Sequence, residues 1–163
     1  MHFLKFSKKG FSIVILFTGI SLPVWPQNPG GKSSLSIEFM GVAQTVSVNY
    51  ERVLIHKSTY FLNGRLGLGL EAFLRPGIPH GITLCFGKKN SFFETGLLSY
   101  FGPTTFGYAD TKRDNWYYLA PVIGYRRQKS KAVLLKIYIC LLVPFNQEYD
   151  LAFLPGLGVG YTF

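Results

Sequence analysis

The stretch Tyr60-Phe61-Leu62-Asn63-Gly64-Arg65-Leu66-Gly67-Leu68-Gly69-Leu70 alternates large apolar residues with small or polar ones. Side chains of a β-strand point alternately to its two faces, so every leucine falls on one face. Asn63, Arg65 and two of the three glycines fall on the other face. A helix would scatter both sets around its axis. The stretch therefore predicts a β-strand with one apolar face and one polar or small face.

Seven further segments show the same alternation and are separated by turn residues, and none of them keeps a helical period. Their lengths centre near the about 9–11 residues that a tilted strand needs to cross a bilayer. The sequence therefore predicts an all-β fold, a closed antiparallel up-and-down barrel of eight strands. The expected strands span residues 34–40, 43–53, 59–72, 79–87, 91–101, 116–126, 132–144 and 153–163.

The composition of the 163-residue chain fits one aromatic, glycine-rich domain. Aromatic residues reach 17% and charged residues only 15%, against a usual value of about 25%, which excludes a disordered chain and a charged helical bundle. Cys85 and Cys140 are too few for a disulfide scaffold, and we expect them to be buried fillers rather than a pair. No histidine joins them at a metal-ligand spacing, so we expect neither metal nor cofactor.

The N-terminus has the three-part layout of a secretory signal peptide. Three lysines precede an apolar run at residues 11–20, which Pro23 ends. This run is shorter than the about 20 residues of a membrane-spanning helix, so an uncleaved anchor is the weaker reading. We expect a signal peptide at residues 1–27 and a barrel domain at residues 28–163.

The formal charge of +9 suggests nucleic-acid binding at first sight. In the expected barrel, however, the positive residues lie in short turns between apolar strands rather than on one helix or groove. An exported chain would also rarely meet nucleic acid, so we expect no nucleic-acid partner.

The connections between the expected strands alternate in length. Those after the second, fourth and sixth strands are short and basic, and those after the third, fifth and seventh are longer. Short turns at one rim and long loops at the other are typical of outer-membrane barrels, whose short turns face the periplasm. The longest connection is residues 102–115.

Glycine and aromatic positions indicate which face points outward. The interior of an eight-stranded barrel is just wide enough for side chains to fill, so small residues belong inside and the apolar face outside. Aromatic residues of the apolar face gather where strands meet the short turns, as at a membrane interface. This expected aromatic girdle contains Tyr50, Tyr60, Phe86, Phe93 and Tyr125.

The strand positions between the apolar ones place charged residues inside the barrel. Buried charges need partners, so we expect an ion-pair network that plugs the lumen, and no continuous water pore. The set contains both carboxylates and cations. We therefore expect these charges to neutralise one another rather than to serve in acid–base catalysis. The expected lumen residues are Glu38, Arg65, Glu71, Glu94, Arg126 and Lys136.

The C-terminal segment 156–163 resembles the assembly signal of bacterial outer-membrane proteins. Phe163 matches its terminal aromatic residue, Tyr161 the apolar position two before it, and Gly158 its glycine, whereas Gly156 replaces a polar residue often found there. With the strand count, the chain resembles the small eight-stranded barrels of the OmpA/OmpX type in Gram-negative bacteria. The resemblance implies residence in the outer membrane, contact with its lipids, and recognition by the barrel assembly machinery through the C-terminal strand.

Three functions remain open at this stage. The first is a non-enzymatic structural or surface-interaction barrel, with an extracellular ligand contacted through loop 102–115. The second is a secreted, soluble, lipocalin-like barrel that carries an apolar ligand, although the Gly-x-Trp signature of lipocalins is missing. The third is a lipid A-modifying enzyme, which would need His80 and a nearby serine such as Ser99. We favour the first and expect no catalytic residues.

Overall fold

The computed structural model describes residues 33–70, 76–102, 116–129, 132–144 and 151–163. The expected signal peptide 1–27, the expected lumen residue Glu71 and all but Gly102 of the loop 102–115 lie outside these residues. In the described part of the chain, no helix is long and apolar enough to cross a membrane.

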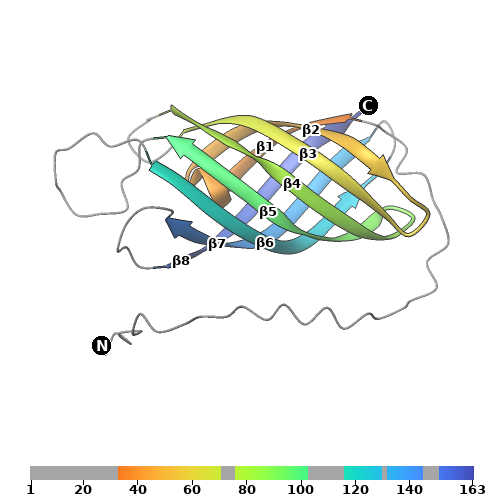
Figure 1. Cartoon of the computed structure of the whole chain (residues 1–163). Coiled ribbons are helices and arrows are strands. Elements are labelled where there is room, and N and C mark those ends of the chain that lie inside the picture. The colour runs from red at the N-terminus through yellow and green to blue at the C-terminus, as the bar shows by residue number, and fades with distance from the viewer. Residues whose placement is uncertain (1–32, 71–75, 103–115, 130–131, 145–150) are drawn as a thin grey trace, which may run out of the picture.

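Eight antiparallel strands close into one barrel, in which each strand pairs with its neighbours in the sequence and β8 pairs with β1 (Figure 1). The expected all-β fold and closed antiparallel barrel are confirmed, and each expected segment overlaps one observed strand. The strands are β1 (Ser33–Met40), β2 (Val46–His56), β3 (Tyr60–Leu70), β4 (Pro76–Lys88), β5 (Ser91–Gly102), β6 (Trp116–Gln128), β7 (Val133–Pro144) and β8 (Ala152–Thr162).

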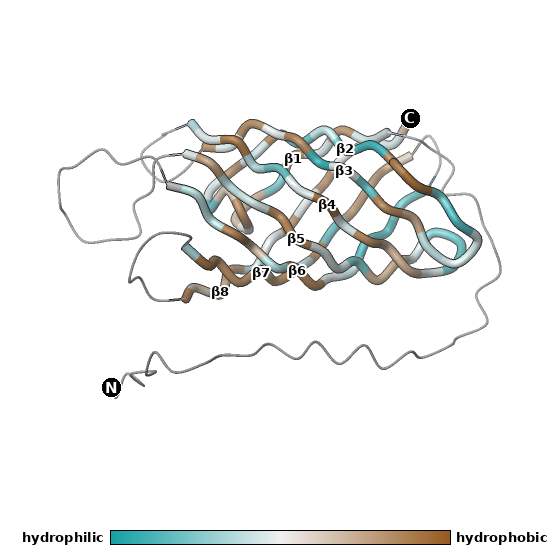
Figure 2. The backbone as a smooth tube through the Cα atoms, in the orientation of Figure 1, coloured by the Kyte–Doolittle hydropathy of each residue, from teal (hydrophilic) through white to brown (hydrophobic). Residues whose placement is uncertain are grey.

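Along each strand, the alternate positions that hold apolar residues face outward, and the positions between them, which hold small or polar residues, face the lumen. In β3, Leu66 and Leu68 are 59% and 72% exposed, whereas the intervening parity holds Arg65 at 5%. Figure 2 shows the same alternation as hydrophobic and hydrophilic segments that follow one another along the strands. The expected orientation, with the apolar side out, is confirmed.

The connection between β1 and β2 differs from the sequence prediction. A strand was expected from Ala43, but β2 begins at Val46, and Gly41–Ala43 form a 3₁₀ turn, η1, that folds into the barrel. The three residues of η1 are all buried. Positive φ angles at Met40 (59°) and Gln44 (69°) turn the chain inward and back again. Side-chain periodicity carries no signal for such a reversal.

Two prolines lie inside strands of a closed barrel, where each missing N–H needs a gap in the ladder. Pro121 pairs with Leu97 on the β5 side, but in the described ladder it has no partner on the β7 side. Pro155 pairs with Ile139 on the β7 side, and the described ladder between β8 and β1 does not reach it. The described ladder is thus interrupted beside Pro121 and ends beside Pro155. β4 also begins three residues earlier than expected, and β2 ends three residues later.

The lumen has three zones along the barrel. At the end with the long connections, η1 packs in an apolar cluster with Tyr100, Tyr138 and Cys140. At the short-turn end, Phe61, Cys85 and Phe92 form a smaller cluster. Both cysteines are free and buried, in different clusters. The zone between the clusters is charged.

Candidate functional site

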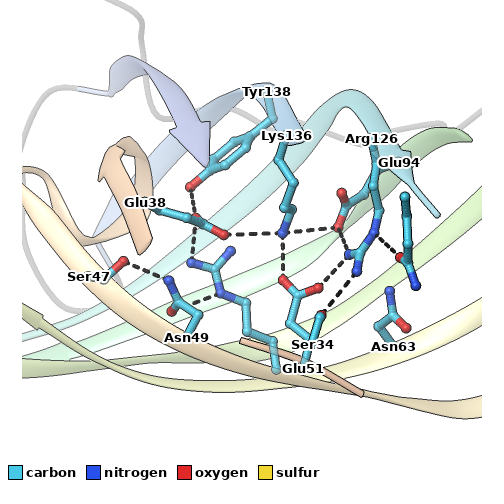
Figure 3. A network of polar contacts seen from close by, with 12 residues as sticks. Ser34, Glu38, Ser47, Asn49, Glu51, Asn63, Glu94, Arg126, Lys136 and Tyr138 are labelled. Atoms are coloured by element: carbon cyan, nitrogen blue, oxygen red, sulfur yellow. Dashed lines mark hydrogen bonds and ion pairs between the residues drawn. The ribbon is translucent and has the colours of Figure 1, made fainter. Parts of the chain in front are cut away.

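Six charged side chains from six different strands meet in the middle of the lumen (Figure 3). Each of these six strands contributes one of them from an inward-facing position, and all six are buried. Three are carboxylates and three are cations, so the formal charge of the cluster is zero. This cluster, called here the lumen network, consists of Glu38, Glu51, Arg65, Glu94, Arg126 and Lys136.

Glu51 is at the centre of the lumen network. Its Oε1 lies 2.5 Å from Lys136 Nζ, and its Oε2 accepts a hydrogen bond from Arg126 Nη1. Lys136 Nζ also lies 3.2 Å from Glu38 Oε1. One ammonium group therefore bridges the carboxylates of β1 and β2, and it does so from β7.

Glu38 forms the second half of the lumen network. Arg65 Nη2 lies 2.7 Å from Glu38 Oε2, and Tyr138 OH donates to the same oxygen at 2.6 Å. Arg65 Nε donates to Asn49 Oδ1 at 3.1 Å, and Asn49 Nδ2 donates to Ser47 Oγ at 2.8 Å. These hydrogen bonds fix the guanidinium between β1 and β2, as buried charges require.

Glu94 lies at the edge of the lumen network. Its Oε1 is 3.5 Å from both Arg126 Nη1 and Lys136 Nζ, which is ion-pair distance without hydrogen-bond geometry. Arg126 Nε donates to Gln128 Oε1 at 2.6 Å, so this guanidinium is held from two sides. The carboxylate of Glu94 is thus the most loosely held of the three.

The structure brings together five of the six lumen residues named from the sequence. Glu71 is the exception, because it lies outside the described residues. Sequence reasoning missed Glu51, which has more hydrogen-bonded ion pairs than Glu94. Glu51 lies two residues after Asn49, on the same inward-facing side of β2, and this position could have identified it.

Four of the five girdle residues form one row across neighbouring strands. Tyr60 pairs with Phe86, Phe86 with Phe93, and Phe93 with Tyr125, all in register on the outward face. The rings of Tyr60 and Phe86 are 6.1 Å apart between centroids. Tyr50, on β2, is also on the outward face and 42% exposed. The row lies beside the short turns of these hairpins.

The residues of the expected assembly signal divide between the two faces of β8. Tyr161 and Phe163 are exposed, whereas Gly158 is buried, and a Cβ there would lie 3.0 Å from Glu38 Cγ. The N–H of Phe163 donates to the carbonyl of Ser33 at 2.8 Å. The same segment thus closes the barrel against β1.

His80 and Ser99 are cross-strand partners at outward-facing positions of β4 and β5, where Ser99 is only 5% exposed. His80 Nδ1 lies 3.0 Å from the carbonyl of Ile78, and Nε2 lies 3.2 Å from Tyr117 OH. A carbonyl only accepts, so Nδ1 carries a proton, and in the neutral ring Nε2 accepts from the tyrosine. Both ring nitrogens thus bond to groups other than Ser99. An activated serine nucleophile would instead need its hydroxyl hydrogen-bonded to the histidine.

Among the described residues, no group of three or more His, Cys, Asp or Glu side chains could hold a metal ion. Comparison with family models, curated proteins and solved structures finds no match for this chain.

Proposed function

We propose that the chain is an integral outer-membrane β-barrel protein of a Gram-negative bacterium, with a closed lumen and a non-enzymatic structural or surface-interaction role. One observation carries the proposal. All eight strands contribute large apolar side chains to the exposed outer surface, and the lumen network holds charges inside. Water-soluble proteins rarely expose contiguous apolar surfaces of this extent, whereas hydrocarbon chains solvate them well.

The dimensions and aromatic residues of the barrel support this proposal. The strands are 8 to 13 residues long, around the about 9–11 residues that span a bilayer when tilted. The aromatic row beside the short turns has a counterpart at the opposite strand ends, where Phe39, Phe101, Tyr117 and Phe153 are exposed. Two such bands match the headgroup regions on either side of a hydrocarbon core.

The filled lumen supports a role other than passive transport. The lumen network crosses the middle of the barrel, and η1 with its apolar cluster fills the end opposite the short turns. Eight strands leave room for side chains but not for a water channel as well. Function is therefore assigned to the outer surface and to the connections, including the segment 102–115 as the contact with an extracellular partner.

The soluble-carrier alternative would need the reverse arrangement. A lipocalin-like barrel holds its ligand in an apolar interior and turns polar side chains to water. Here the described interior holds six charged side chains between two apolar clusters, and exposed leucines such as Leu66, Leu68 and Leu157 lie on the exterior. The proposal also retains export by the signal peptide and recognition of the C-terminal strand by the assembly machinery.

Detergent phase partition of the mature protein tests the proposal. The protein should enter the detergent phase and run faster on a gel before boiling than after it, because the folded barrel resists the detergent. A protein that stays in the aqueous phase would contradict the membrane function and return attention to the soluble carrier.

A further inference from the structure

Among the described residues, the charged side chains outside the lumen are all cations, and all of them lie at the rim formed by the short turns. The three described carboxylate side chains are inside the lumen network, and no ion pair joins them to these outer cations in the described ranges. The described part of the rim therefore presents positive charge without an acidic side chain to compensate it. These turn-rim cations are Arg52, Lys57, Lys88, Lys89, Arg127 and Lys129, all exposed.

Three of the turn-rim cations repeat one arrangement. Each follows an aromatic residue by two positions, so the ring and the cation share the outward face of one strand. At about 3.3 Å per residue, the cation lies roughly 7 Å farther along the strand, toward the short turn. The three pairs are Tyr50 with Arg52, Phe86 with Lys88, and Tyr125 with Arg127.

The tyrosine hydroxyls of two pairs bind the serines that lie opposite the cations on the neighbouring strand. Tyr50 OH lies 3.0 Å from Ser33 Oγ, and Ser33 is the cross-strand partner of Arg52. Tyr125 OH donates to Ser91 Oγ at 2.8 Å, and Ser91 is the partner of Arg127. The hydroxyl of each ring thus reaches the level of the cation, while the ring itself lies beside the exposed apolar side chains of the outer surface, as at a membrane interface.

We propose that the turn-rim cations bind the phosphate groups of anionic phospholipids in the leaflet that surrounds the short turns. The inference rests on the proposed membrane function. Guanidinium and ammonium groups donate charge-assisted hydrogen bonds to phosphate, and an anionic lipid surface attracts each such cation. A soluble polyanion would also be attracted, but the repeated ring–cation spacing fits a layer in which phosphate lies just beyond hydrocarbon.

The test uses the mature protein in bilayers of phosphatidylcholine alone or mixed with phosphatidylglycerol. Lipids that remain with the protein after mild extraction are quantified by mass spectrometry, and the phosphatidylglycerol fraction is compared with the bulk. The variant Arg52→Gln, Lys88→Gln, Arg127→Gln should reduce the enrichment roughly fivefold or more at low salt. The matched variant Arg52→Lys, Lys88→Arg, Arg127→Lys keeps the charge and should keep the enrichment.

Each other outcome has a distinct meaning. Insertion into both bilayers without enrichment, or equal enrichment in the Gln variant, would overturn the lipid inference and leave the membrane function standing. Failure to insert into either bilayer would overturn the membrane function itself. Loss of enrichment when inorganic phosphate is added at constant ionic strength would assign the rim to free phosphate. Binding of soluble single-stranded DNA as tight as that of anionic vesicles would assign it to a soluble polyanion.

Discussion

Glu51 and Lys136 are 85 positions apart in the chain, yet Glu51 Oε1 and Lys136 Nζ lie 2.5 Å apart inside the barrel. Arg126 Nη1 donates to the other oxygen of the same carboxylate. One carboxylate of β2 therefore compensates cations of β6 and β7 across the lumen. The lumen network joins strands that are not neighbours in the sheet, and so it ties opposite walls of the barrel together.

Glu51→Gln should destabilise the folded barrel by about 3–5 kcal/mol, because it leaves two buried cations short of one negative charge. Urea unfolding of the protein refolded in detergent measures the loss. Arg52→Gln is the matched control, since the adjacent side chain is exposed and should change the free energy of unfolding by about 0.5 kcal/mol or less. Equal stability of the two variants would mean that Glu51 does not hold the network together.

Leu66→Arg tests whether the outward face meets hydrocarbon. Leu66 is 59% exposed in the middle of β3, where an arginine should cost about 2–4 kcal/mol in a bilayer and impair assembly. Leu66→Phe keeps the side chain apolar and should assemble normally. The measurement is the folded fraction in bilayers from gel mobility before boiling, and the same folded fraction for both variants would show that this face is not in lipid.

The period-two alternation predicted the strands and their number, and the glycine and aromatic positions predicted which face points outward. This success has a local cause, because each strand by itself must present apolar residues to one side and small or polar residues to the other. Glycines that alternate with the leucines, such as Gly67 and Gly69, together with the aromatic positions, predicted the inward face. No knowledge of distant partners was needed for that step.

The contacts inside the lumen could not be predicted in the same way. Parity gives the face on which Glu51 lies, but the height and direction of its side chain depend on strand tilt and stagger around the barrel. The position of η1 was missed for a different reason. A reversal with φ of 59° at Met40, a non-glycine residue, leaves no mark on hydrophobic periodicity.

Met40→Gly should stabilise the fold by about 1 kcal/mol. Met40 has φ 59° and ψ −143°, a region that suits glycine and costs other residues about 1–3 kcal/mol, less the greater freedom of glycine in the unfolded chain. Gly41→Ala should do the opposite, since φ there is 66° and an added Cβ would collide with the Tyr138 ring. Equilibrium unfolding of both variants checks the signs, and a destabilised Met40→Gly would contradict the strain.

Cys85 and Cys140 should not react with a maleimide in the folded protein. Both thiols are free, and the two residues are 0% and 1% exposed. Unfolding in denaturant should make both reactive, and Ser91→Cys should add one thiol that reacts in the folded state, because Ser91 is exposed. Labelling of Cys140 in the folded protein would show that the cluster around η1 opens to solvent.

The protein, added to lipid A in mixed micelles, should leave the acyl chains of the lipid unchanged, and mass spectrometry of the lipid measures this. The reason is the engagement of both ring nitrogens of His80 with Ile78 and Tyr117 rather than with Ser99. His80→Ala and Ser99→Ala should then match the parent protein in this assay. Acyl release by the parent that both substitutions abolish, in variants that still fold by gel mobility, would replace the structural role with hydrolysis by a serine nucleophile.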